Sequence, residues 1–290
     1  MAPFLHLGPI TIPTYGLMVA IAMVAAYFVL RADFARRGIA DKQSPLAEIF
    51  IAVPCLAGIV GAKLYHELES PRDFFADPIH HLFSQFGFAW FGGLIAGFAA
   101  FILLARHKKI PLLEVLDAGS PAAALGYGIG RIGCLLSGDG DYGVPTSLPW
   151  GMSFPHGLVP TTQRVHPTPI YEFLAACVIA WILWRIGGRL IAKARAVGSG
   201  GAARGGKPLR GNVVESSGGE RAGAVFAAYL VLTGAARFLV EFIRINPRSF
   251  FGLTNAQAAS LVSILAGAVL WWHTTREARV AVKSPVSQRP

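Results

Sequence analysis

The sequence predicts an all-α, polytopic membrane protein with seven transmembrane helices, an N-terminus outside and a C-terminus in the cytoplasm. Three observations support this prediction. Of the 290 residues, 53% are hydrophobic and only 14% are charged, whereas soluble domains carry about 25% charged residues. Seven apolar stretches approach the roughly 20 residues that a helix needs to cross a bilayer. Finally, Lys and Arg are abundant in every second connection between these stretches and scarce in the others. This asymmetry sets the orientation of a protein in the membrane.

The apolar stretches define the spans, and we expect 1–290 to form a single membrane domain. The first, third and last stretches are apolar, whereas the other four carry ionisable residues. The predicted spans are 14–31, 46–65, 87–105, 112–136, 170–187, 222–242 and 256–273. The predicted connections include a Gly-, Ala- and Arg-rich flexible cytoplasmic loop (188–221), a Pro- and Gly-rich outer, periplasmic loop (137–168) and a cytoplasmic tail (275–290).

The distribution of basic residues gives the orientation. With these spans, 19 Lys and Arg residues fall on one side of the membrane and four on the other. The richer side is cytoplasmic by the positive-inside rule, which places the N-terminus outside. No Lys or Arg precedes the first span, so the basic region of a cleavable signal peptide is missing and we expect this helix to be retained.

Several other functions are disfavoured by the same sequence. The net charge of +10 comes from loops between apolar stretches, without a basic groove, so nucleic acid is not an expected partner. Cys55, Cys134 and Cys177 lack paired spacing, so no metal site, disulfide or cofactor is predicted. The glycine-rich run 126–133 superficially matches a dinucleotide loop, but it lies inside an apolar stretch with no preceding strand. Its glycines instead allow close contacts between helices.

Ionisable residues within membrane spans are costly and are therefore candidates for function. The predicted orientation brings such residues from different spans to one depth near the outer surface. They include Lys63, Glu67, Arg131, Glu172, Arg237 and Glu241, with Tyr15 opening the first span. One interpretation is a structural ion-pair seam. The other is an anion site, since two arginines with few matching acids at that depth fit the phosphate of a phospholipid headgroup.

Three segments resemble the signatures of the prolipoprotein diacylglyceryl transferase family. They are GRIGCLLSGDGDYG (130–143), HPTPIYE (166–172) and RFLVEFIR (237–244). In addition, Tyr15-Gly16-Leu17 and the run 92–95 are similar to parts of the family's first and third helices. The resemblance covers most of the chain, with its motifs in order.

This resemblance implies a multi-pass transferase of the bacterial inner (plasma) membrane that acts in lipoprotein maturation. Such an enzyme transfers a diacylglyceryl group from phosphatidylglycerol to the lipobox cysteine thiol of a preprolipoprotein. The implied partners are phosphatidylglycerol, preprolipoprotein signal peptides and membrane lipid. By the resemblance, Arg131 and Arg237 hold the phosphate, Glu241 orients Arg237, and Tyr15 lines the lipid site. Glu172 and Arg244 complete the expected substrate-binding residues.

The chain departs from the family pattern at positions that concern proton transfer. Phe91 stands where the family has a histidine proposed as the base for the thiol, and Cys134 replaces an asparagine. Phenylalanine cannot accept a proton, so we expect His166, and after it Asp139, to be the candidate catalytic base. A purely structural His166 that caps the fifth span remains the alternative.

Two further functions were compared with the transferase. The first is a non-catalytic or differently specific membrane protein of the same fold that binds an anionic phospholipid, and Phe91 is its distinguishing feature. The second, a retinal-binding photoreceptor, is disfavoured because the span 256–273 contains no Lys for a Schiff base.

Overall fold

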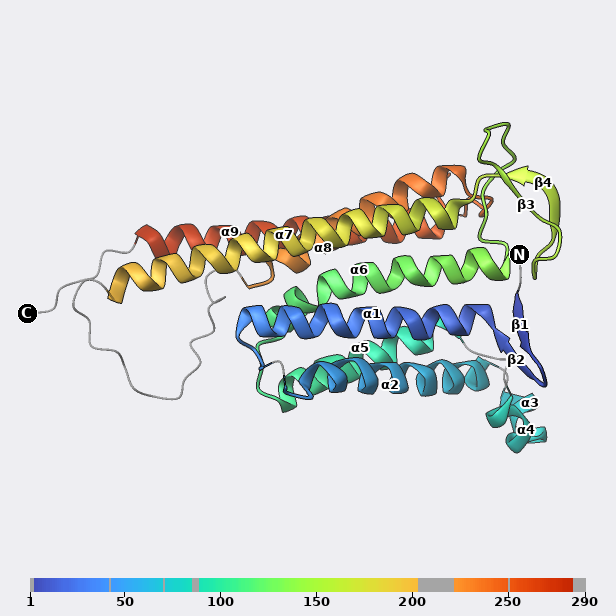
Figure 1. Ribbon diagram of the computed structural model, residues 1–290, viewed down its shortest axis with the longest axis horizontal. Coiled ribbons are helices and arrows are strands. Elements are labelled where there is room, and N and C mark those ends of the chain that lie inside the picture. Colours follow the sequence, from blue (N-terminus) through green and yellow to red (C-terminus); the bar gives the residue numbers. More distant parts are fainter. Residues whose placement is uncertain are drawn as a thin grey trace, which may run out of the picture. The chain divides into compact units, whose positions relative to one another are not determined.

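The computed structural model describes residues 3–41, 43–69, 71–84, 89–202, 222–249 and 251–283. Within these ranges, seven helices of 17 to 35 residues correspond one to one with the seven apolar stretches (Figure 1). They are α1 (Thr14–Arg37), α2 (Leu46–Glu69), α5 (Trp90–His107), α6 (Leu112–Ser137), α7 (Thr168–Ala202), α8 (Ala224–Val240) and α9 (Asn255–Lys283).

Five of these helices, in the part of the chain that the structure describes, are long and apolar enough to cross a membrane. They are α1, α2, α7, α8 and α9, while the apolar part of α5, Phe91–His107, is shorter. Helix α6 lies outside this set, is rich in glycine and alanine, and carries three charged residues. The prediction of a mainly helical protein with several membrane-spanning segments is therefore confirmed.

Short elements lie at the ends of the long helices. Strands β1 (Phe4–Leu7) and β2 (Ile10–Pro13) form an antiparallel hairpin directly before α1. Helices α3 (Pro71–Ala76) and α4 (Pro78–Phe83) follow α2, and a 3-10 turn, η1 (Glu241–Ile243), follows α8. The connection between α6 and α7 contains the antiparallel pair β3 (Met152–Phe154) and β4 (Thr161–Val165).

The connection between α6 and α7, predicted as an outer loop, has a small apolar core of its own. Tyr142, Phe154 and Val165 are buried together, and the rings of Tyr142 and Phe154 stack with their centroids 5.2 Å apart. This packing gives the connection a fixed path, which matters because Asp139 and Asp141 lie at its beginning.

The chain, predicted to form a single membrane domain, comprises two compact units, each described by itself. The first unit contains residues 1–39 and 116–290, and the second contains residues 40–115. In the second unit, α2 and α5 approach so closely that a methyl group on Gly61 would lie 2.2 Å from Ala96 Cβ. Glycine at this position is therefore required by the spacing of the helices.

In the first unit, α8 packs against both α7 and α9. Leu183 and Val225 are fully buried at the centre of an apolar cluster between α6, α7 and α8. Asp117, a charged residue within the apolar helix α6, has structural partners here. Its carboxylate accepts hydrogen bonds from the backbone N–H groups of Gly223 (2.9 Å) and Phe226 (2.8 Å), so it satisfies unpaired donors at the start of α8.

Two predicted helix ends were placed too early. Helix α7 continues to Ala202, so residues 188–202 are helical rather than part of the predicted loop 188–221. The reason is that Ile191 is buried and Leu190 packs on the apolar cluster. Helix α9 likewise continues to Lys283 through the start of the predicted tail 275–290. The rest of both segments, 203–221 and 284–290, lies outside the described residues.

Candidate functional site

The ionic cluster of the first unit consists of three arginines and three carboxylates at one end of its helices. Arg131 lies near the end of α6, Glu172 in the first turns of α7, Arg237 near the end of α8, and Glu241 at the start of η1. Asp141, from the α6–α7 connection, and Arg244, just after η1, complete the cluster. Residues more than 100 positions apart in the sequence thus meet at one place.

Glu172 is the centre of the ionic cluster, because all three arginines contact it. Its Oε1 lies 2.6 Å from Arg237 Nη1, and its Oε2 lies 3.3 Å from Arg131 Nε and 3.7 Å from Arg244 Nη1. The hydroxyl of Tyr127 also donates to Oε1 at 2.7 Å. The side chain of Glu172 is only 4% exposed, so its negative charge depends on these donors.

Glu241 links the two arginines at the α8 end of the cluster. Its Oε2 lies 3.0 Å from Arg237 Nη2 and 3.5 Å from Arg244 Nε. The side-chain amide of Asn246 donates to its other oxygen at 2.5 Å. The close approach of Glu241 to Arg237 fits the orienting role implied by the family resemblance.

Asp141 joins the cluster from the α6–α7 connection. One carboxylate oxygen pairs with Arg131 Nη1, and the other lies 2.5 Å from Arg244 Nη2. Burial opposes ionisation of this carboxyl, but the guanidinium groups of Arg244 and Arg131 outweigh burial and hold the pKa of Asp141 below its usual value. Asp141 is therefore ionised at neutral pH. Its side chain is 30% exposed.

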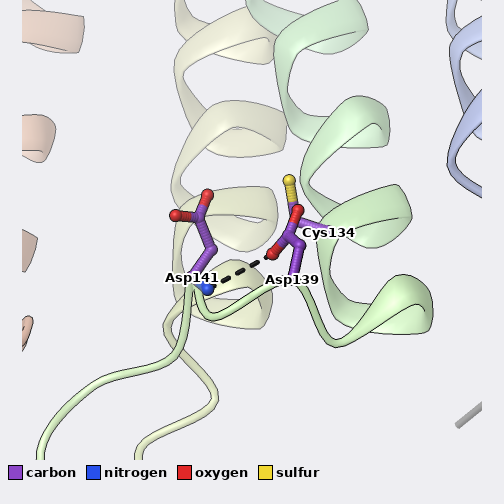
Figure 2. A group of neighbouring side chains, drawn as sticks. All are labelled: Cys134, Asp139 and Asp141. Carbon is purple, nitrogen blue, oxygen red and sulfur yellow. Dashed lines mark hydrogen bonds between the residues drawn. The ribbon is translucent and has the colours of Figure 1, made fainter. Parts of the chain in front are cut away.

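Asp139 and Cys134 form a separate pair beside the cluster. Figure 2 shows the carboxylate of Asp139 next to the sulfur of Cys134, with a hydrogen bond of 3.2 Å from the backbone N–H of Asp141. Burial raises the pKa of Asp139, and repulsion from Asp141 adds to the increase, while a hydrogen bond from Cys134 opposes it. Asp139 thus holds a proton more readily than an ordinary aspartate.

The ligand atoms of Cys134, Asp139 and Asp141 lie within 4.8 Å of one another, which is close enough for a metal ion. The surrounding charge argues against a cation, however. Arg131 Nη1 is 3.7 Å from the sulfur and also pairs with Asp141, so a positive group already occupies this side. We assign no metal to these residues.

The structure brings most of the sequence-predicted site residues together. Arg131, Glu172, Arg237, Glu241 and Arg244 all belong to the ionic cluster. The ring of Tyr15 lies beside Gly133. A methyl group added to Gly133 would lie 3.1 Å from Tyr15 Cδ2. Two other residues are placed differently.

Of the predicted site residues, His166 lies outside the ionic cluster, and Phe91, which replaces the family's histidine, lies in the second unit. The ring of His166 contacts the hydroxyl of Tyr171, with Nδ1 at 3.2 Å, rather than a charged group of the cluster. Phe91 lies in the first turn of α5, in the second unit, and is 63% exposed.

The sequence-based expectation that few acids match the arginines was wrong. In the described chain, Asp141, Glu172 and Glu241 balance the three arginines one for one. The connection after α6 supplies Asp141 and the start of α7 supplies Glu172, and both pair with arginines of the cluster. Asp141 and Tyr127 were missed as members of the site. The spacing of Tyr127 four residues before Arg131 was the available signal, because such residues share a helix face.

Comparison with known proteins identifies the family of this chain. The family model "Prolipoprotein diacylglyceryl transferase" matches residues 3–200 and 212–273. The chain belongs to this family. Among members of the prolipoprotein diacylglyceryl transferase family, the protein named phosphatidylglycerol–prolipoprotein diacylglyceryl transferase of Geobacter sulfurreducens is 32% identical over 255 residues. That alignment covers 86% of this chain and 84% of the relative.

Two further relatives carry the same name. The protein of Clostridium tetani is 30% identical, with 87% of this chain and 89% of the relative covered. The protein of Bordetella bronchiseptica is 30% identical, with 94% of each chain covered. The family model leaves out residues 201–211, which fall within the segment predicted to be a cytoplasmic loop. The matched ranges include every residue of the ionic cluster.

Proposed function

We propose that this protein transfers a diacylglyceryl group from phosphatidylglycerol to the cysteine thiol of a prolipoprotein. The observation that carries the proposal is the convergence of three guanidinium groups on a buried carboxylate at one end of a bundle of apolar helices. Membership of the transferase family supplies the reaction. A guanidinium fork matches phosphate oxygens geometrically, and a lipid substrate requires a site that opens to a membrane.

The reaction needs charge stabilisation at the phosphate. The thiol sulfur forms a bond to the terminal glyceryl carbon of the diacylglyceryl group, and the bond from that carbon to the phosphate oxygen breaks. Glycerol phosphate leaves with the electron pair, and the thiol proton passes to a base. Arg131 and Arg237 stabilise the negative charge that develops on the leaving group, which is the usual role of fixed cations in a partly buried site.

Asp139 is a better candidate than His166 for the base. It lies beside Cys134, which in turn contacts Arg131, and burial raises its pKa toward the working range of a general base. His166 is engaged with Tyr171. A carboxylate near the phosphate-binding arginine thus replaces the histidine that Phe91 cannot supply. The catalytic reading is accordingly preferred to a non-catalytic lipid-binding protein.

We infer that α5 and α6 also cross the inner membrane, giving seven spans with the N-terminus outside. The distribution of 19 and four basic residues supports this orientation. Arginine–aromatic pairs one turn apart support it as well, because such pairs anchor helices at a membrane surface. Arg185 lies 5.6 Å from the ring centre of Trp181 on α7, at the end of the predicted span 170–187, and Arg276 lies 4.8 Å from that of Trp272 on α9, just beyond the predicted span 256–273.

The test combines purified protein, phosphatidylglycerol and a lipobox peptide, with the mass of the peptide as the readout. We expect the mass of one diacylglyceryl group to be added to the cysteine. Arg131→Ala and Arg237→Ala should each lower the rate by at least about a hundredfold. Arg248→Ala, which removes an exposed arginine near the same end, is the matched control and should retain the rate. Wild-type activity in both cluster variants would refute the proposal.

A further inference from the structure

The Asp141 carboxylate is bound in the way that a phosphate would be bound. Each of its oxygens faces a different guanidinium group, one from Arg131 and the other from Arg244. Guanidinium N–H groups bind phosphate oxygens through the same kind of charge-assisted contact. The carboxylate of Asp141 and a phosphodiester also carry the same single negative charge.

Asp141 differs from the other two carboxylates of the cluster in its exposure. Its side chain is 30% exposed, compared with 4% for Glu172 and 0% for Glu241. Moving a charge out of the cluster into water is therefore least costly for Asp141, whose solvation is already partial.

The backbone of Asp141 is fixed independently of its side chain. Its carbonyl oxygen accepts hydrogen bonds from Arg244 Nη1 at 3.1 Å and from the hydroxyl of Thr168 at 2.5 Å. Its N–H donates to Asp139. Rotation of the side chain alone can therefore vacate the place between the two arginines, and the connection keeps its path.

The charges of the three arginines and their three direct carboxylate partners favour such an exchange. Three arginines already face three carboxylates, so an added phosphodiester would leave the cluster with an excess negative charge. If the phosphodiester replaces the Asp141 carboxylate, the sum of charges in the cluster is unchanged. Glu172 and Glu241 then keep the arginines in place while the anion is exchanged.

We propose that Asp141 is a built-in placeholder for the substrate phosphate, and that phosphatidylglycerol binds between Arg131 and Arg244 by displacing its carboxylate. This inference rests on the proposed function for the identity of the anion. It makes Arg244 a ligand of the phosphate and Asp141 an internal competitor of the substrate. Because a competing group lowers the fraction of binding-competent sites, removing its charge raises the apparent affinity.

The experiment compares equilibrium binding of phosphatidylglycerol and of zwitterionic phosphatidylcholine to detergent-solubilised wild-type protein, Asp141→Asn and Asp141→Ser. We expect both variants to bind phosphatidylglycerol about three- to tenfold more tightly than the wild type, with binding of phosphatidylcholine unchanged. Asp41→Asn makes the same chemical change at an exposed carboxylate outside the cluster, and it should bind as the wild type does. Arg244→Ala should weaken binding of the anionic lipid.

Equal or weaker binding of phosphatidylglycerol by both Asp141 variants would overturn the inference. So would a loss of fold in both variants when phosphatidylglycerol is present, because a placeholder is dispensable once its competitor is bound. The binding measurement does not involve transfer to a peptide. A wild-type protein that binds phosphatidylglycerol but never modifies the peptide would therefore refute the proposed function and leave the result on Asp141 standing.

Discussion

Replacing Glu172 with glutamine tests whether this residue holds the ionic cluster together. The substitution preserves the size of the side chain but removes the charge that faces Arg131, Arg237 and Arg244 at 3.3, 2.6 and 3.7 Å. Three guanidinium groups would then face two carboxylates. Mutual repulsion of the arginines and the loss of their shared acceptor should both destabilise the folded state.

The magnitude follows from burial. Removing one partner of a buried ion pair costs about 3–5 kcal/mol. The side chains of Arg131 and Arg237 are 18% and 24% exposed, whereas that of Arg244 is 5% exposed. Partial hydration of two of the three arginines places the expected loss near the lower limit, about 3 kcal/mol. For a chain of this size that loss lowers the melting temperature by roughly 6 °C.

The assay is thermal unfolding in detergent, followed by fluorescence, with Asp141→Asn as the comparison. The more exposed Asp141 should lower the melting temperature by much less, since partly exposed pairs contribute about 1 kcal/mol or less. Added phosphatidylglycerol should restore part of the loss in Glu172→Gln, because an anion can replace the missing charge. A melting temperature within 2 °C of the wild type, roughly 1 kcal/mol, would show that Glu172 is not the centre of the cluster.

Two further results are expected. The transfer rate should fall at acidic pH as Asp139 becomes protonated, with a midpoint above the ordinary pKa of 3.8, because burial raises the pKa of Asp139. Asp139→Asn should lower the rate by about a hundredfold. A pH profile that is unchanged in this variant would exclude Asp139 as the base. Separately, Gly61→Ala should reduce thermal stability by about 1–3 kcal/mol, since the new methyl group would meet Ala96 at 2.2 Å. Gly130→Ala should be tolerated, because a methyl group there would have no neighbour within 4 Å among the described residues outside its own stretch of helix.

The positions of the long helices could be predicted because each one follows from local sequence. A helix that faces lipid must be apolar over its whole length, so its presence is visible without knowledge of its neighbours. The ends of α7 and α9 were less predictable. Whether Ile191 continues a helix depends on the apolar surface against which it packs, and that surface is formed by other parts of the chain.

The candidate site shows the same division. Arg131, Arg237 and Glu241 were identified because a charge within an apolar helix is conspicuous in the sequence. Asp141 was not among the predicted site residues, although it lies two positions after Asp139 in the segment 130–143 that resembles the family signature. Its pairing with Arg244 joins residues 103 positions apart, and no local pattern encodes such a contact.

The sequence by itself determined that this protein is helical, that several segments are apolar enough for a membrane, and that its motifs belong to one transferase family. These properties depend on residue type and spacing along the chain. Only the tertiary structure decided that the three arginines are balanced by three acids and that Glu172 lies at their centre. Charge balance is a property of distances in space, and electrostatic energy falls with the separation of the charges and not with their separation in sequence.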